Sequence, residues 1–269
     1  MKLCHPPTLT SVLLFLALIL SPWTSAVSGE PGAFYLKGGL GASFSADTDF
    51  SDRDCNSSDP AALFGCGTGN NGKSLGSEGD FGTALPLELG AGYQVNEWLR
   101  TELLFTYRAG FAFSGTSNFS QIDRTFQQKV DGDVTNFSGM LNAVFDLSPF
   151  FNGNCGKLHP LLLGGIGFSY NEIDSMTYQF PTTSTATPDG STTQFGWNIG
   201  AGAAYEFSDR ISLELIYRYS DLGRIETDAD KMVITRNSDN SVITDSITID
   251  KTRADFSIHE VLFSVVWYF

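Results

Sequence analysis

Apolar residues alternate with polar or very small ones in eight separate segments of the chain. Alternation with a period of two places successive side chains on opposite faces of a β-strand. The pattern therefore predicts an all-β chain of eight strands. The predicted strands are Phe34–Phe44, Leu85–Val95, Leu99–Phe113, Val134–Leu147, Leu161–Tyr170, Gln194–Phe207, Ile211–Leu222 and Phe256–Phe269.

The connections between these strands alternate in length. The shorter connections are Asn96–Trp98, Ser148–Pro160 and Ser208–Arg210, and the long ones are Ser45–Ala84, Ser114–Asp133, Asn171–Thr193 and Gly223–Asp255. Short turns on one side and long loops on the other are typical of outer-membrane barrels, whose turns face the periplasm. We predict an eight-stranded antiparallel up-and-down transmembrane β-barrel with long extracellular loops, formed as a single domain by residues 27–269.

The faces of the predicted strands support a lipid environment. In Gln194–Phe207, one face carries aromatic residues at both ends and small aliphatic residues between them. Aromatic rings settle at the two membrane interfaces, which explains this order in a strand that faces lipid. The segment Ile211–Tyr219 shows the same alternation.

Ten charged residues within the predicted strands fall on the parity opposite the apolar stripe. A Lys or Arg on the lipid face near the bilayer midplane costs about 2–4 kcal/mol, which accounts for this sorting. We therefore predict a lumen charge network of four basic and six acidic groups, which pair and fill the narrow interior. An ion pathway through the lumen is the alternative. The network residues are Lys37, Glu88, Arg100, Glu102, Arg108, Asp146, Glu206, Glu214, Arg218 and Glu260.

The N-terminal residues 1–26 are predicted to be a cleaved signal peptide. Lys2 gives a positive start, Leu9–Leu20 is apolar, and small residues precede Ala26. A retained membrane anchor is the alternative, but the apolar run is short compared with the roughly 20 residues that span a bilayer.

The composition excludes some classes of function. The chain has 16 Lys plus Arg against 30 Asp plus Glu, a formal net charge of −14, which argues against nucleic acid as a partner. The four long loops hold 20 acidic and 9 basic residues, so most of the negative charge is displayed outside. The acidic positions lack the spacing of a calcium loop, and we predict neither a metal site nor a cofactor.

Three cysteines follow the signal peptide. Cys55 and Cys66 lie in the first long loop, whereas Cys155 lies in a turn at the opposite rim. An apolar band about 25 Å tall separates the two rims, and a disulfide requires Cα atoms within about 7 Å. We therefore predict a Cys55–Cys66 disulfide and a free Cys155.

The last nine residues carry a family resemblance. Phe263, Val265, Trp267 and Phe269 share one face at the C-terminus, and this end resembles the C-terminal assembly signal of Gram-negative outer-membrane barrels. Together with the signal peptide and the strand count, the whole mature chain resembles the small OmpA/OmpX and opacity-protein barrels. The resemblance implies secretion to the periplasm, assembly by the barrel-assembly machinery, and a monomer in the outer membrane in contact with lipid and lipopolysaccharide.

Two features of the sequence suggest chemistry but also have simpler interpretations. Gly67–Ser74 satisfies the pattern G-x-x-x-x-G-K-[ST], but neither the strand nor the helix that a phosphate loop needs is predicted around it. Ser257 and His259 share the outward parity of the last strand. A base beside a hydroxyl nucleophile would suit an enzyme that modifies outer-leaflet lipid, but no carboxylate is placed to orient the base. The simpler interpretation is that Ser257 and His259 form a polar pair at the membrane interface.

The sequence leaves three classes of function open. The first is a non-catalytic barrel that displays loops for adhesion, surface binding or envelope integrity. The alternatives are a narrow passive, porin-like channel and a lipid-modifying barrel enzyme. The β-rich runs Lys231–Arg236 and Val242–Ile249, around Asn237–Asn240, predict a hairpin in the last long loop. We expect it to prolong strands seven and eight as a projecting ribbon, whose unpaired edges could accept a strand of a partner.

Overall fold

The computed structural model describes residues 30–52, 67–119, 128–151 and 156–269. Strands account for most of these residues, and the described helical structure is a short 3-10 turn at Ser148–Phe151. None of the described helical residues forms a helix long and apolar enough to cross a membrane. The predicted signal peptide and the three mature cysteines lie outside the described residues, so those predictions stand untested.

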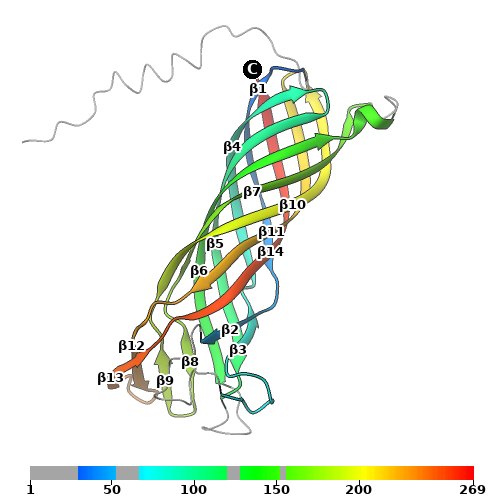
Figure 1. Cartoon of the computed structure of the whole chain (residues 1–269). Helices are drawn as coiled ribbons and strands as arrows, with labels where there is room; N and C mark the ends of the chain where they lie inside the picture. The colour runs from blue at the N-terminus through cyan, green and yellow to red at the C-terminus, as the bar shows by residue number, and fades with distance from the viewer. Residues whose placement is uncertain (1–29, 53–66, 120–127, 152–155) are drawn as a thin grey trace, which may run out of the picture.

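Eight long strands form the wall of a barrel (Figure 1). Each overlaps one predicted segment. They are β1 (Phe34–Ser45), β4 (Thr83–Asn96), β5 (Leu99–Ser117), β6 (Gln128–Asp146), β7 (Leu158–Ile173), β10 (Gly190–Ser208), β11 (Ile211–Glu226) and β14 (Thr252–Tyr268). Sequential strands pair antiparallel, and β1 also pairs with β14 from Tyr35↔Tyr268 to Ser45↔Ile258, which closes the ring. The predicted up-and-down barrel is confirmed.

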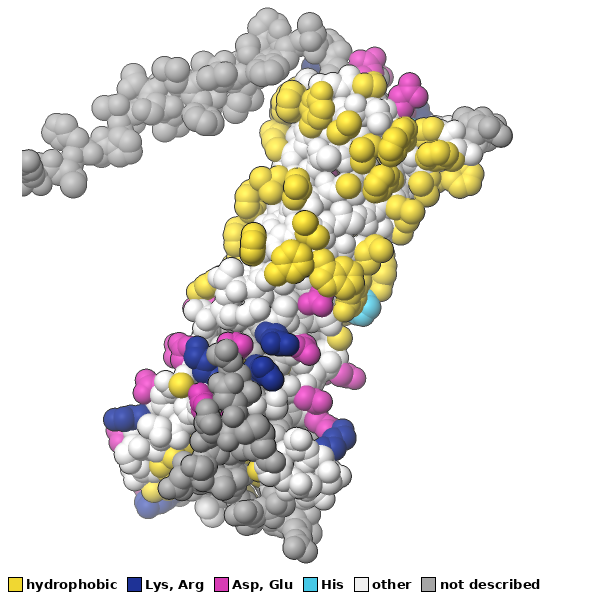
Figure 2. All heavy atoms as spheres, in the orientation of Figure 1, with side chains coloured by type: hydrophobic (Ala, Val, Ile, Leu, Met, Phe, Trp, Pro, Cys, Tyr) yellow, Lys and Arg dark blue, Asp and Glu magenta, His cyan; other side chains and the backbone are white. Residues whose placement is uncertain are grey.

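Large apolar side chains cover the outside of one half of this barrel. Figure 2 shows them gathered near the end that holds the C-terminus, whereas most charged side chains of the visible face lie over the other half. Leu89 is 70% exposed and Phe168 is 66% exposed on this apolar belt. An exposed apolar surface of this extent indicates a membrane-facing wall.

Six short strands lie in the regions predicted as long loops. They are β2 (Thr48–Asp52), β3 (Ser77–Asp80), β8 (Thr177–Gln179), β9 (Thr183–Ala186), β12 (Asp230–Arg236) and β13 (Val242–Ile249). β2 and β3 fill the wall between β14 and β5, and β8 and β9 join β6 to β12. The described parts of the extracellular loops therefore prolong the barrel wall outward.

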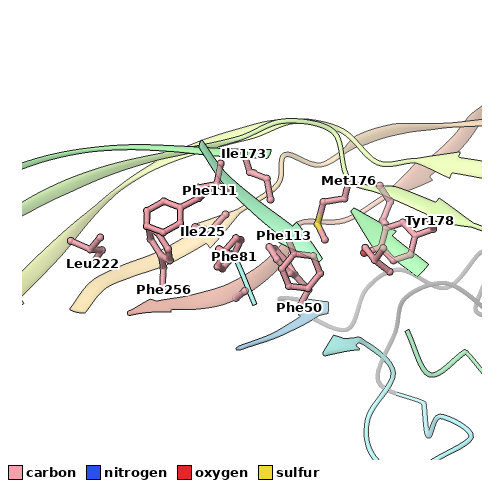
Figure 3. Packing of buried hydrophobic residues seen from close by; sticks show 14 of the residues in the cluster. Phe50, Phe81, Phe111, Phe113, Ile173, Met176, Tyr178, Leu222, Ile225 and Phe256 are labelled. Atoms are coloured by element: carbon pink, nitrogen blue, oxygen red, sulfur yellow. The ribbon is translucent and has the colours of Figure 1, made fainter. Parts of the chain in front are cut away.

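The extracellular half is packed around its own apolar core. Phe256 contacts Phe81 with a ring-centroid distance of 5.1 Å and Phe111 with 5.2 Å, and Phe50 contacts Phe113 with 5.1 Å. All five rings are buried. Figure 3 shows these rings between the strands, with Met176 and Tyr178 of the β7–β8 region further out. The loops are thus held in place by a core of the kind that water-soluble domains use.

The β12–β13 hairpin forms where the sequence predicts it, but one of its edges differs from the prediction. Thr227 donates its backbone N–H to the carbonyl of Thr252 at 3.0 Å, so the hairpin continues β11 and β14 outward. The outer edge of β12 is paired with β9, and two register shifts interrupt the β12–β13 pairing. Bulges and paired neighbours protect sheet edges, so β12 is a poor template for strand addition, whereas β13 ends the described sheet order and keeps one unpaired edge there, as predicted.

Candidate functional site

Eight of the ten predicted lumen residues form a continuous buried network. In its periplasmic layer, the Lys37 Nζ lies 3.3 Å from Glu102 Oε1 and 3.0 Å from Glu214 Oε2. Arg100 also pairs with Glu214 and donates to the Tyr268 hydroxyl at 3.1 Å. These residues come from β1, β5, β11 and β14, so the ion pairs tie opposite walls of the barrel together.

The outer layer of the network is centred on Glu260. Its two carboxylate oxygens accept bonds from Arg108 Nε at 2.8 Å and Arg218 Nε at 2.9 Å. Arg218 also reaches Glu88 at 2.7 Å, and Glu88 lies 3.9 Å from Lys37. Glu88 therefore links the two layers, and every charge has a partner of opposite sign.

Asp146 and Glu206 lie apart from this network. They stand at the periplasmic ends of β6 and β10, where both contact His159 instead. Six predicted acids less these two leave four, against the four bases, so the lumen network is balanced in charge. Strand parity identifies the inward face correctly, but it contains no information on height along the barrel.

A polar layer that the sequence analysis did not single out covers the outer end of the network. Arg108 donates to Asn136 Oδ1 at 2.7 Å, and Asn136 donates to Asn171 Oδ1 at 2.7 Å. Asn171 in turn donates to the carbonyl of Leu222 at 2.9 Å. The sequence signal for this polar layer is the presence of Asn136 and Asn171 at positions that face inward. Above this layer begins the apolar core, so the interior changes from ionic to polar to apolar along the axis.

The periplasmic rim carries a second cluster that was not predicted. The Nδ1 atom of His159 lies 2.9 Å from Asp146 Oδ2 and 3.0 Å from Ser148 Oγ, and its Nε2 atom lies 3.3 Å from Glu206 Oε1. The hydrogen bond to Asp146 raises the pKa of His159, which lies at the periplasmic end of β7. This cluster has little signal in the sequence, because a histidine before a proline in a predicted turn is ordinarily a surface residue.

Ser257 and His259 lie on the outer wall without forming a catalytic arrangement. The Nδ1 atom of His259 is 2.7 Å from the Tyr217 hydroxyl oxygen, and the His259 ring lies tilted against the Tyr219 ring at a centroid distance of 5.2 Å. The contacts described for His259 are with these two tyrosines, and Ser257 is not among its described partners. The histidine is thus part of an aromatic group near the outer interface.

The segment with the phosphate-loop pattern forms a tight turn. Gly69 donates its N–H to the carbonyl of Lys73 at 2.8 Å, and Asn118 donates to Asn71 Oδ1 at 2.9 Å. Lys73 pairs with Glu78 on the surface, and this bond raises the pKa of Lys73. The next described element is strand β3, so the helix N-terminus that would hold phosphate is absent from this described region.

The residues of the assembly signal line the outside of β14 and the chain end. Phe263, Val265 and Trp267 face outward and are exposed. Phe269 packs against Trp267 with a centroid distance of 5.9 Å and donates its N–H to the carbonyl of Phe34 at 3.1 Å. The last residue therefore contributes to the β1–β14 closure of the barrel.

A membrane-facing belt, a paired ionic lumen and antiparallel closure define an outer-membrane β-barrel. The sequence profile of the outer membrane protein beta-barrel domain family matches residues 10–269, and the chain belongs to this family. It is accordingly a protein of the bacterial outer membrane.

Curated relatives add little about activity. Uncharacterised proteins of Brucella abortus (strain 2308) and Brucella melitensis biotype 1 are 27% identical over 145 residues, which is 49% of this chain and 49% of each relative. The alignment thus spans about half the length of these relatives.

Solved structures show the same fold. OprG of Pseudomonas aeruginosa is 15% identical with a TM-score of 0.50, covering 89% of this chain and 97% of that one. Neisserial surface protein A is 16% identical with a TM-score of 0.41, covering 91% and 99%. The Escherichia coli outer membrane protease OmpT is 8% identical with a TM-score of 0.44, covering 93% and 100%. At these identities the similarity concerns the fold alone.

Proposed function

We propose that the protein is a non-catalytic outer-membrane barrel that displays its acidic extracellular half as a rigid surface for binding, in adhesion or envelope integrity. The observation that carries this proposal is the contrast between a membrane lumen filled by paired charges and an extracellular half packed around an aromatic core.

The filled lumen favours display over a narrow passive channel. Glu260 and Glu214 each contact two basic side chains, and all these groups are buried. Opening a water-filled path would separate ion pairs inside the barrel, and removing one partner of such a pair costs about 3–5 kcal/mol.

The packed core favours binding by the extracellular half. A loop that is already ordered loses little conformational entropy when it contacts a partner. The side chains around the outside of this core include ion pairs such as Arg224–Asp255 and Lys251–Asp228, at 3.3 Å and 3.1 Å. This ordered surface carries the acidic surplus of the loops, which favours partners with basic surfaces.

The lipid-modifying alternative is less well supported. His259 is engaged by Tyr217, which is the expected behaviour of polar aromatic residues at a membrane interface. An enzyme would require the Ser257 hydroxyl to contact the imidazole, and the described contacts of that imidazole are with Tyr217 and Tyr219 instead.

Two measurements on the purified, refolded protein test the proposal. We expect no steady single-channel conductance in planar bilayers and no release of fatty acid from vesicles that contain lipopolysaccharide. Reproducible conductance would establish the channel, and fatty-acid release that is lost in Ser257→Ala would establish the enzyme.

A cellular measurement tests the display surface directly. Val242 and Ile243 are 60% and 50% exposed at the tip of the β12–β13 hairpin. We expect V242S/I243S to reduce adherence of expressing cells to immobilised matrix proteins with basic surfaces. The matched control is Phe150→Ser in the periplasmic turn, where Phe150 is 69% exposed. Equal adherence of cells with and without the protein on every surface would contradict the proposal.

A further inference from the structure

His159 connects the periplasmic ends of three adjacent strands. It lies on β7, and its two ring nitrogens face carboxylates on the neighbouring strands: Asp146 of β6 at 2.9 Å and Glu206 of β10 at 3.3 Å. A neutral imidazole has one N–H, whereas the protonated ring has two. The contact between His159 Nε2 and Glu206 is an ion pair at 3.3 Å without hydrogen-bond geometry. Only the protonated ring carries a positive charge and an N–H on each nitrogen, so only this form attracts both carboxylates and ties all three strands together.

The same three side chains line two cavities. The wider one has a volume of about 310 Å³ and is also lined by Glu30 and Glu97 at the periplasmic end. The other has a volume of about 30 Å³ and is lined by Arg100 at the base of the ion-pair network. Because Asp146, His159 and Glu206 belong to the lining of both, they form the partition between them.

The arrangement suits a proton better than a metal ion. A metal ion would bind one ring nitrogen, with carboxylate oxygens about 2 Å from the same ion. Here the two carboxylates face different ring nitrogens of His159, and these point away from each other. The three ligands therefore do not converge on one point.

We propose that His159 is a proton-operated latch at the periplasmic mouth of the barrel. With both ring nitrogens protonated, it bridges β6 and β10 and keeps the partition closed. When the ring releases one proton to water, one of the two carboxylate contacts is lost, and the two cavities join. The device is independent of what the extracellular half binds.

The surroundings of His159 favour the charged ring. The facing titratable and charged groups are Asp146 of β6, Glu206 of β10, Glu30 of the N-terminal segment, Glu97 of the β4–β5 turn, Arg100 of β5 and Tyr268 of β14. Four carboxylates thus oppose one guanidinium. The bond to Asp146, together with the charges of Asp146 and Glu206, raises the pKa of His159 above its ordinary value, against the opposing effects of burial and of Arg100. The stabilisation is fully present below about pH 6.5, the ordinary value, and is lost as the pH rises through the raised value.

Amide hydrogen exchange on the full chain in detergent micelles tests the latch. We expect protection at the periplasmic ends of β6, β7 and β10 to fall on the order of tenfold between pH 5.5 and 9, after correction for intrinsic exchange. His159→Gln should abolish this step, because glutamine does not titrate. Glu206→Gln should leave a smaller step that lies at lower pH.

The matched control is His259→Gln, which changes the other described histidine, on the outer wall near the opposite end of the belt. It should retain the full step. A step that persists in His159→Gln, or its absence from the wild-type protein, would overturn the proposal. Loss of the step in His259→Gln would also overturn it, because the titration would then belong to the barrel as a whole.

Discussion

The membrane half and the extracellular half of the barrel are built from the same strands with opposite interiors. On β14, Glu260 points into the ionic lumen and Val261 points to lipid, whereas further out Phe256 points into the apolar core and Asp255 points to water. Along β14, inward and outward positions alternate without interruption. What changes is the type of side chain on each face: the membrane half places a charged side chain inward, and the extracellular half places an apolar one there. The solvent on the outside therefore decides which face is apolar.

Two of the strands change register at the boundary between these halves. An extra residue lies in β5 between Arg108 and Phe111, and another lies in β11 between Asp221 and Arg224. Each bulge contains a glycine with positive φ: Gly110 at 94° and Gly223 at 77°. Such a bulge changes which positions face inward. The bulges let these strands supply charged residues to one interior and apolar residues to the other.

The largest effect is expected from Glu260→Gln in the membrane half. This change removes the charge that neutralises Arg108 and Arg218, and both guanidinium groups would remain buried. We expect a loss of about 3–5 kcal/mol in the free energy of unfolding, measured by urea titration in lipid vesicles. Asp255→Asn on the same strand is the control, because that side chain is 87% exposed. Equal stability of the two variants would mean that the lumen network contributes little.

A comparable but more local effect is expected from Phe256→Ala in the extracellular half. Phe256 packs against Phe81 and Phe111, and its removal leaves a cavity in the core. Phe→Ala changes in a core cost about 3–5 kcal/mol, but a site that relaxes falls at the lower end. Hydrogen exchange should increase in the outer strands while Lys37 and Glu102 remain protected in the lumen. Uniform loss of protection along the barrel would show that the halves unfold together.

The sequence predicts the membrane half of the barrel better than the extracellular half. The eight long strands were predictable because lipid on one side enforces strict alternation, as in β10 and β14. The short strands β2, β3, β8 and β9 were not, because three to five residues contain too few alternations to distinguish a strand from a loop. Simple alternation continued past Arg108 would also place Phe111 and Phe113 on the lipid face, whereas the bulge turns both inward.

The sequence predicts which charged residues face the lumen, but it does not predict which of them form ion pairs. Parity identifies Arg100 and Glu214 as inward residues, but their pairing joins positions 114 residues apart and depends on barrel closure. The rim cluster around His159 was missed for a related reason. The carboxylates of Asp146 and Glu206 come close to His159 only when β6, β7 and β10 lie side by side.

The bulges themselves are expected to show a graded effect. A Cβ at Gly223 would lie 2.4 Å from Gln194 Cβ, whereas one at Gly110 would meet no atom within 4 Å. Both changes impose a side chain on a positive φ, which costs about 1 kcal/mol. We expect Gly223→Ala to destabilise more than Gly110→Ala in the same urea titration. The reverse order would indicate that the β11 bulge relaxes where the β5 bulge does not.

The smallest effect is expected from Lys73→Ala, outside both interiors. Among the described residues, Lys73 forms an ion pair with Glu78, and its side chain is 65% exposed, so solvent and salt screen the interaction. The turn around it is held instead by Asn118, which donates to Asn71 Oδ1 and to the carbonyl of Ser74. The urea midpoint should be unchanged, and ATP should not shift it for either protein, because no helix follows the turn. A clear shift with ATP that disappears in Lys73→Ala would restore the nucleotide-binding interpretation. A loss of stability in Asn118→Ala alone would place the organisation of this loop in the asparagine rather than in the surface charge.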